Sequence, residues 1–150
     1  MRKVKVYAIF IALTFAVGWT SAALFPPDEW YRTLNKPPFN PPDWVFPIAW
    51  SIIYVMVGLA GGRAWVAGLM GVPLLFWITQ LGLNGFWSYL FFGLNSPGAA
   101  LIEVFFFLAT IIGFIWSTWK FERTAALLFL PYLAWVSFAT VLNAAIWWLN

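Results

Sequence analysis

The chain contains no cysteine and no histidine. The absence of cysteine excludes disulfides and thiolate metal sites. The absence of histidine removes the commonest metal ligand and the usual general acid or base near neutral pH. We therefore expect no metal site, no required cofactor and no hydrolytic catalytic centre.

Charged residues are also scarce. They make up 9% of the chain, against about 25% in a typical soluble domain, whereas hydrophobic residues make up 63%. Such a chain cannot cover a water-facing surface, so the composition predicts a multi-pass integral membrane protein in contact with lipid. The net charge of +3 does not indicate nucleic-acid binding, because the basic residues form no stripe.

Five apolar runs are each long enough for a membrane helix, which needs about 20 residues. They cover residues 6–25, 44–62, 71–92, 98–118 and 125–149. The turn signal Asn95-Ser96-Pro97-Gly98 separates the third run from the fourth. We predict one all-α domain over residues 1–150, a bundle of five transmembrane helices, with a kink at Pro131 that frees the carbonyl of Leu127.

The basic residues predict how the bundle is oriented, because cytoplasmic loops carry an excess of lysine and arginine. With five spans, six basic residues share one side of the membrane and two share the other. The larger set is Arg2, Lys3, Lys5, Arg63, Lys120 and Arg123, and the smaller set is Arg32 and Lys36. We therefore expect a cytoplasmic N-terminus in a bacterial or archaeal cell membrane.

The first long loop, residues 26–43, holds six of the ten prolines. Proline restricts the backbone before folding, so an ordered conformation of this loop costs less entropy. The loop leads directly into an apolar segment that carries Trp44, Trp50 and Tyr54. These features predict a lid that closes one end of a pocket in the bundle.

Three predicted spans carry faces of aromatic and amide side chains at helical spacing, and the first span carries small residues instead. The faces are Phe46, Trp50, Tyr54 and Gly58; Gln80, Asn84, Trp87, Ser88 and Phe91; Trp135, Ala139, Leu142 and Asn143; and Thr14, Gly18 and Ala22. Ordinary helix packing with interhelical amide hydrogen bonds would explain them, and so would the walls of a ligand pocket. The proline-rich lid favours the pocket.

Other tryptophans lie near the ends of the predicted spans. They are Trp44, Trp119, Trp147 and Trp148, and their positions are typical of the aromatic belts at membrane interfaces.

Glu103 is the one carboxylate inside a predicted span. It would either bind a proton or cation, or reach the membrane interface or a hydrogen-bonding neighbour. We favour the second interpretation.

Short motifs occur together along nearly the whole chain. They are Trp30-Tyr31 with Leu34, Lys36-Pro37 and Pro41-Pro42; Trp44-Val45-Phe46-Pro47 and Trp50; Gln80-Leu81, Asn84, Trp87-Ser88 and Phe91-Phe92; and Pro131-Tyr132-Leu133, Trp135, Phe138-Ala139-Thr140 and Leu142-Asn143. No single motif is specific, but their combined spacing resembles the TspO/translocator protein family of tryptophan-rich sensory proteins, also known as peripheral-type benzodiazepine receptors. The resemblance implies a five-helix membrane bundle, a homodimer and a pocket beneath the first loop.

By the same resemblance, the pocket binds porphyrins and related tetrapyrroles of the protoporphyrin IX type, or other hydrophobic small molecules. The ligand-binding residues that the resemblance implies are Tyr31, Pro41, Phe46, Trp50, Tyr54, Asn84, Trp87, Ser88, Trp135, Ala139 and Leu142. Because the chain lacks histidine, a metal-free porphyrin held by stacking is favoured over ligated haem. After Tyr132 the chain has no lysine or arginine, so it lacks the cholesterol motif of animal members.

Three functions stay open at this point. The first is a receptor or sensor for tetrapyrroles. The second is an enzyme that degrades porphyrins with light and oxygen, for which the resemblance implies Trp50 and Trp135 as the catalytic residues. The third, a transporter, is disfavoured because Gln80 and Glu103 are the only candidates for a polar path.

Overall fold

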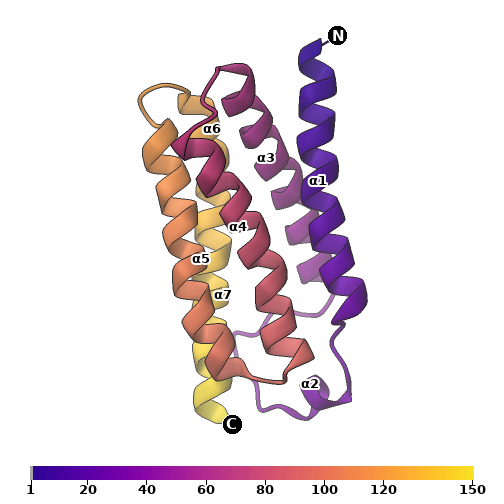
Figure 1. Ribbon diagram of the computed structural model, residues 1–150. Coiled ribbons are helices and arrows are strands. Elements are labelled where there is room, and N and C mark those ends of the chain that lie inside the picture. The colour runs from indigo at the N-terminus through magenta and orange to yellow at the C-terminus, as the bar shows by residue number, and fades with distance from the viewer. Residues whose placement is uncertain (1) are drawn as a thin grey trace.

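The computed structural model describes residues 2–150, and these residues form helices and no strand. The elements are α1 (Arg2–Leu24), α2 (Glu29–Thr33), α3 (Val45–Val66), α4 (Val72–Ser88), the π-helix η1 (Tyr89–Gly93), α5 (Pro97–Thr118), α6 (Arg123–Leu128) and α7 (Leu130–Leu149). The long helices run side by side, with the start of α1 at one end and α2 and the C-terminus at the other (Figure 1). The all-α class predicted from the sequence is confirmed.

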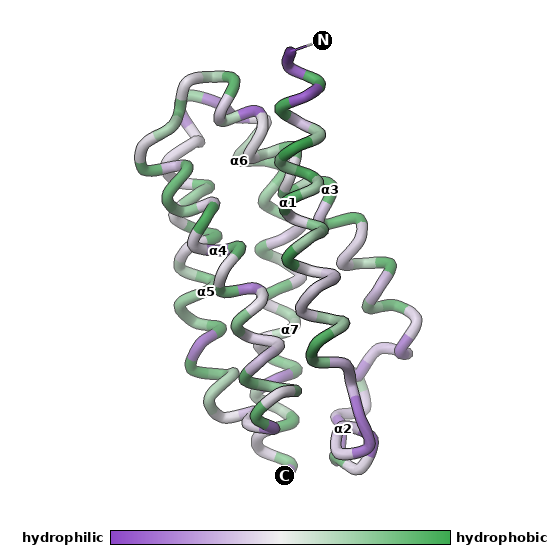
Figure 2. The backbone as a smooth tube through the Cα atoms, turned by 45° about the vertical axis from the view of Figure 1, so that its right-hand side comes forward, coloured by the Kyte–Doolittle hydropathy of each residue, from purple (hydrophilic) through white to green (hydrophobic). Residues whose placement is uncertain are grey.

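Four helical stretches are long and apolar enough to cross a membrane. They are α1, α3, α5 and the stretch Arg123–Leu149, which contains α6 and α7. The 17 residues of α4 continue into η1, so helical backbone extends from Val72 to Gly93. Hydrophobic residues follow the long helices, whereas hydrophilic residues gather at the start of α1 and around α2 (Figure 2).

The half of the bundle away from α2 is a closed core. The Trp77 indole donates to the Val57 carbonyl at 2.9 Å, and the Tyr132 hydroxyl donates to Gln80 Oε1 at 2.7 Å. Gln80 Nε2 in turn donates to the Trp77 carbonyl at 2.7 Å. These bonds satisfy the buried polar groups that link α3, α4 and α7, as a dry core requires.

The turn predicted at residues 95–98 is confirmed, and it follows an unpredicted π-helix. In η1 the Leu94 N–H donates to the Tyr89 carbonyl at 2.8 Å. The chain then reverses through Asn95, whose φ of 51° lies in the left-handed region that asparagine tolerates. The Ser96 side chain caps α5 by accepting from the Ala99 N–H at 3.3 Å.

The last long helix is interrupted close to Pro131, where the sequence predicts a disturbance. The helix α6 ends at Leu128, and α7 begins at Leu130 after a capping residue, Phe129. Pro131 lies in the first turn of α7, where a missing N–H costs little. Because a proline disturbs the turn that precedes it, the break at Phe129 lies where its effect is expected, and it takes the form of a one-residue interruption between two helices.

The interpretation favoured for Glu103 is wrong. The residue is only 6% exposed, and neither carboxylate oxygen has a hydrogen-bond partner among residues 2–150. It lies on the face of α5 that also carries the buried residues Ala100 and Phe107. This face packs inward, so the short side chain of Glu103 cannot reach the membrane interface.

Candidate ligand-binding site

A cavity of about 660 Å³ lies at the lid end of the bundle. Residues of α1, α3, α4, η1, α5 and α7 line it, together with residues of the segment that contains α2. This volume falls within the range of about 300–1,000 Å³ that is usual for small-molecule sites. The lining is mainly aromatic and aliphatic, so the cavity suits a hydrophobic ligand.

The lid over the cavity is ordered by local contacts. The Asp28 side chain caps α2 by accepting from the Tyr31 N–H at 3.3 Å. Lys36 Nζ donates to the Tyr31 carbonyl at 2.8 Å and lies 4.3 Å from the centroid of the Tyr31 ring, a cation–π contact. These bonds hold Tyr31 and Lys36 together at the rim of the cavity, where both line it.

The lid is also attached to the end of α7. The Asn35 N–H donates to Asn150 Oδ1 at 3.0 Å, and Asn150 Nδ2 donates to the Asn35 carbonyl at 2.9 Å. This reciprocal pair joins two segments that are 115 residues apart in the sequence. It restrains the lid at a point beyond its own short helix.

One wall of the cavity is built from aromatic side chains of α3 and α7. The ring centroids of Trp50 and Trp135 lie 6.2 Å apart with their planes at 87°, an edge-to-face arrangement. On the same wall, the ring centroid of Phe46 lies 5.9 Å from that of Trp135. The Trp135 Nε1 is buried and has no hydrogen-bond partner among the described residues.

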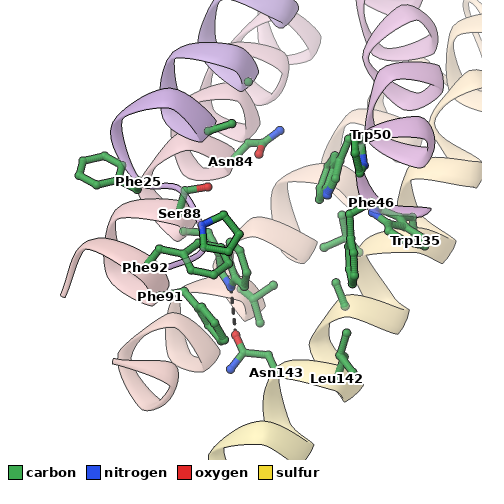
Figure 3. Close-up of a pocket in the computed structure, with 18 of the residues that line it drawn as sticks. Phe25, Phe46, Trp50, Asn84, Ser88, Phe91, Phe92, Trp135, Leu142 and Asn143 are labelled. Atoms are coloured by element: carbon green, nitrogen blue, oxygen red, sulfur yellow. Dashed lines mark hydrogen bonds between the residues drawn. The ribbon is translucent and has the colours of Figure 1, made fainter. Parts of the chain in front are cut away.

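The facing wall comes from α4 and η1. Asn84, Ser88, Phe91 and Phe92 lie opposite Trp50, Phe46 and Trp135 across the cavity (Figure 3). The Trp87 ring, also on this wall, stacks on Phe91 with centroids 4.9 Å apart. The two walls thus present aromatic surfaces to the space between them.

One amide links the walls. Asn143 on α7 accepts from Trp87 Nε1 at 3.0 Å (Figure 3), and its Nδ2 donates to the Pro97 carbonyl at 2.8 Å. Asn143 therefore binds α4 and the start of α5 at once. Because its exposed fraction is 2%, these two bonds are made away from solvent and fix the orientation of Trp87.

Charges lie only at the lid side of the cavity among the lining residues. They are Arg32, Lys36 and Asp43. Arg32 forms an exposed ion pair with Glu29 at 3.3 Å, a kind of contact that contributes little stability. Burial, and after it the negative charge of Asp43, raises the pKa of Tyr31, so the phenol stays neutral in the lid.

Ten of the eleven residues implied by the family resemblance line this cavity, including both tryptophans implied as catalytic. The exception is Pro41, a half-buried lid residue that is absent from the lining. Three members of the predicted helix faces also lie outside the lining. Gln80 is occupied by its bonds to Tyr132 and Trp77, and Gly58 packs against Ile11 of α1. The third, Thr14, is buried and donates to the Phe10 carbonyl of its own helix at 2.8 Å.

The sequence analysis did not assign several lining residues. They are Trp19, Phe25 and Pro27 from the first helix and the lid, Val104 and Phe107 from α5, and Phe92, Phe138 and Ile146. Most are apolar residues in long apolar runs, so nothing in the sequence separates them from lipid-facing positions. Phe92 follows Phe91 directly, and the pattern of an ordinary helix does not place both on one face.

The chain is similar to known proteins over most of its length. The model of the TspO/MBR family matches residues 10–149. A tryptophan-rich sensory protein of Cereibacter sphaeroides is 39% identical, and the alignment covers 91% of this chain and 88% of that protein. The tryptophan-rich protein TspO of Archaeoglobus fulgidus is 42% identical over 100% of this chain and 99% of its own length. The translocator protein of Homo sapiens is 33% identical over 79% of this chain and 73% of its own.

Proposed function

We propose that this chain, which belongs to the TspO/MBR family, is a membrane receptor or sensor that binds porphyrins and related tetrapyrroles in the cavity beneath α2. The family match agrees with the motifs from which it was predicted. The observation that carries the proposal is the cavity of about 660 Å³, with aromatic side chains on two facing walls. A flat macrocycle gains both dispersion and hydrophobic burial between such walls.

The chemistry of the lining residues fits this class of ligand. Trp50 and Trp135 offer ring surfaces to a flat ligand. The charges of Arg32 and Lys36 lie at the lid rim, where the propionates of a porphyrin would keep contact with water. Asn84, also in the lining, offers a further polar contact deeper in the cavity.

The proposal includes five membrane spans and a cytoplasmic N-terminus. The combined length of α4 and η1, Val72 to Gly93, supports a fifth span beside the four stretches that qualify by length and hydropathy. The ion pair of Arg63 with Glu122 at 3.0 Å joins the end of α3 to the start of α6. It supports the assignment of Arg63 and the basic loop at 120–123 to one membrane side.

We also expect a homodimer, as the family resemblance implies. The exposed face of α4 carries Ile78, Gly82 and Phe86, and a Cβ added at Gly82 would meet no atom within 4 Å. The mass of the protein in detergent tests this expectation. A monomer at micromolar concentration would refute it.

Tryptophan fluorescence tests the binding proposal. Protoporphyrin IX should quench the wild-type protein in liposomes with micromolar or tighter affinity. The Trp50→Phe, Trp135→Phe variant should bind more weakly, but by less than the ~1–3 kcal/mol that truncating one stacking ring to alanine costs, because phenylalanine keeps a smaller ring. The matched control is Trp116→Phe, Trp148→Phe, which changes two rings that are 74% and 80% exposed. Equal affinities for the two double variants would refute the stacking site.

A second candidate function is the degradation of porphyrins with light and oxygen. The observation that favours it is the contact of Trp50 with Trp135 in the cavity wall, since an indole can lose one electron to an excited macrocycle. Dioxygen would take this electron from the reduced macrocycle and become superoxide. The indole radical cation would then regain an electron from the macrocycle, so that the macrocycle is oxidised by one electron overall and dioxygen is reduced by one. Illumination of the protein with protoporphyrin IX should then give a new absorbing product, which the Trp50→Phe, Trp135→Phe variant fails to form. Bleaching at the rate of the free porphyrin would refute this function.

A further inference from the structure

The helices α1 and α3 are in close contact along only part of their length. A Cβ added at Gly58 would lie 2.5 Å from the Cα of Ile11, and one added at Gly62 would lie 2.6 Å from Cδ1 of Tyr7. At these two glycines the backbone of α3 therefore lies directly against α1. The wall between the two helices is closed at this end of the bundle.

Nearer the lid, side chains of both helices line the cavity. Trp19 and Ala22 of α1 and Pro47 and Ser51 of α3 all contribute to its lining. Trp19 is 65% exposed, and Ala22 and Pro47 are exposed as well. Side chains that face both the cavity and the outside mark an opening in the wall, and these four lie along the facing edges of two neighbouring helices.

On the side away from the lid, the opening ends at Gly18. A side chain at this position would collide with the ring of Tyr54 on α3, so the helices touch again one residue before Trp19. On the lid side, the opening ends where α1 ends, at Leu24. The opening thus spans roughly one and a half turns of helix, about 8 Å along the axis.

The edges of this opening are apolar. The Ser51 hydroxyl donates to the Pro47 carbonyl of its own helix at 2.6 Å and offers no free donor. The Trp19 ring packs edge-on against Phe15, with centroids 5.0 Å apart. Both helices are long and apolar enough to cross a membrane, so the opening faces the bilayer and not water.

We propose that the ligand of this cavity enters sideways from the bilayer, through the opening between α1 and α3, with Trp19 and Ala22 at its edge. The ligand is a flat hydrophobic molecule that has first partitioned into the membrane. The alternative way in, beneath the lid, passes the charges of Arg32 and Asp43 and requires release of a segment that is bonded to Asn150. The identity of the ligand rests on the proposed function, but the position of the opening does not.

Narrowing the opening should slow association and dissociation together. In Ala22→Phe the new ring lies at the edge, whereas in Ala23→Phe, the matched control, it replaces an exposed alanine outside the lining. Stopped-flow quenching by protoporphyrin IX in liposomes should show association and dissociation both slower by roughly tenfold or more in Ala22→Phe. Ala23→Phe should match the wild type. Trp19→Ala widens the opening without overpacking and should speed both rates.

A second readout needs no porphyrin. The chain has no cysteine, so Ser88→Cys places a single thiol in the cavity lining. A bilayer-soluble maleimide should label it much faster than a charged maleimide, and adding Ala22→Phe should slow only the bilayer-soluble reagent. Equal labelling by both reagents, with no effect of Ala22→Phe or Trp19→Ala, would overturn the proposal. If labelling behaves as expected but protoporphyrin IX does not quench, the binding function fails while the opening stands.

Discussion

The amide of Asn143 gives a sharp test of what holds the cavity walls in place. It accepts from Trp87 Nε1 at 3.0 Å and donates to the Pro97 carbonyl at 2.8 Å. The substitution Asn143→Ala removes both bonds. It leaves the Trp87 N–H and the Pro97 carbonyl without their partner beside a mainly apolar cavity.

The expected loss follows from these two bonds. Interhelical hydrogen bonds in membrane proteins average about 0.6 kcal/mol and reach about 1.7 kcal/mol, so losing two lowers the free energy of unfolding by about 1–3 kcal/mol. For a chain of this size each kcal/mol lowers Tm by about 2–4 °C, so Asn143→Ala should unfold about 2–12 °C below the wild type.

The assay is thermal unfolding in one detergent of the wild type, Asn143→Ala, Trp87→Phe and the double variant. Trp87→Phe removes the indole donor but keeps an aromatic ring, and Trp116→Phe at a 74% exposed position controls for the loss of an indole. A double-mutant cycle isolates the Trp87–Asn143 bond, with a coupling of about 0.6–1.7 kcal/mol. A wild-type Tm for Asn143→Ala, or additivity within about 0.3 kcal/mol, would refute the reasoning.

Three further predictions concern other parts of the molecule. Gly58→Ala should destabilise the protein by about 1–3 kcal/mol in thermal unfolding, because its Cβ would lie 2.5 Å from the Ile11 backbone. Gly82→Ala should leave the unfolding of the monomer unchanged, because no atom of the same protomer lies within 4 Å of the added Cβ, and equal Tm values for the two variants would contradict the close contact at Gly58. Glu103→Gln should unfold no earlier than the wild type, because neither carboxylate oxygen has a partner to lose; a large drop in Tm would show that the carboxylate is bound. Burial raises the pKa of Tyr31 in the folded protein. The neutral phenol therefore contributes to folding stability in full below about pH 10, and this contribution is lost as the pH rises through the pKa of the folded state. Tyr31→Phe should therefore lose less stability than the wild type between about pH 9 and pH 12, and identical Tm profiles would count against the effect.

The sequence was sufficient to predict where the helices lie, because charges and prolines mark their ends. The uncharged runs fall on helices in the structure, and the turn at Asn95-Ser96-Pro97-Gly98 divides η1 from α5 where predicted. The error over Glu103 has a physical cause, because the residue lies on an inward face that its charge alone does not reveal. The break at Phe129 lies in the turn before Pro131, where a proline disturbs a helix.

The walls of the cavity could be predicted from helical spacing only in part. Helical spacing predicts that Gln80 shares a cavity wall with Asn84, and Gly58 with Tyr54. In the structure Asn84 and Tyr54 line the cavity, whereas Gln80 and Gly58 do not. Its inner limit is set by the partners that these residues find, Tyr132 for Gln80 and Ile11 for Gly58. Such contacts join helices that are far apart in the sequence, and periodicity within one helix carries no information about them.

The position of a bound tetrapyrrole tests the central claim most directly. A crystal structure of the protein with zinc protoporphyrin IX, whose zinc gives an anomalous signal, would locate the macrocycle without reference to the fit of side chains. The account predicts one zinc peak inside the cavity, with the ring plane against Trp50 or Trp135 and the propionates towards Arg32 and Lys36. A peak on the lipid-facing surface, with the cavity empty, would contradict it.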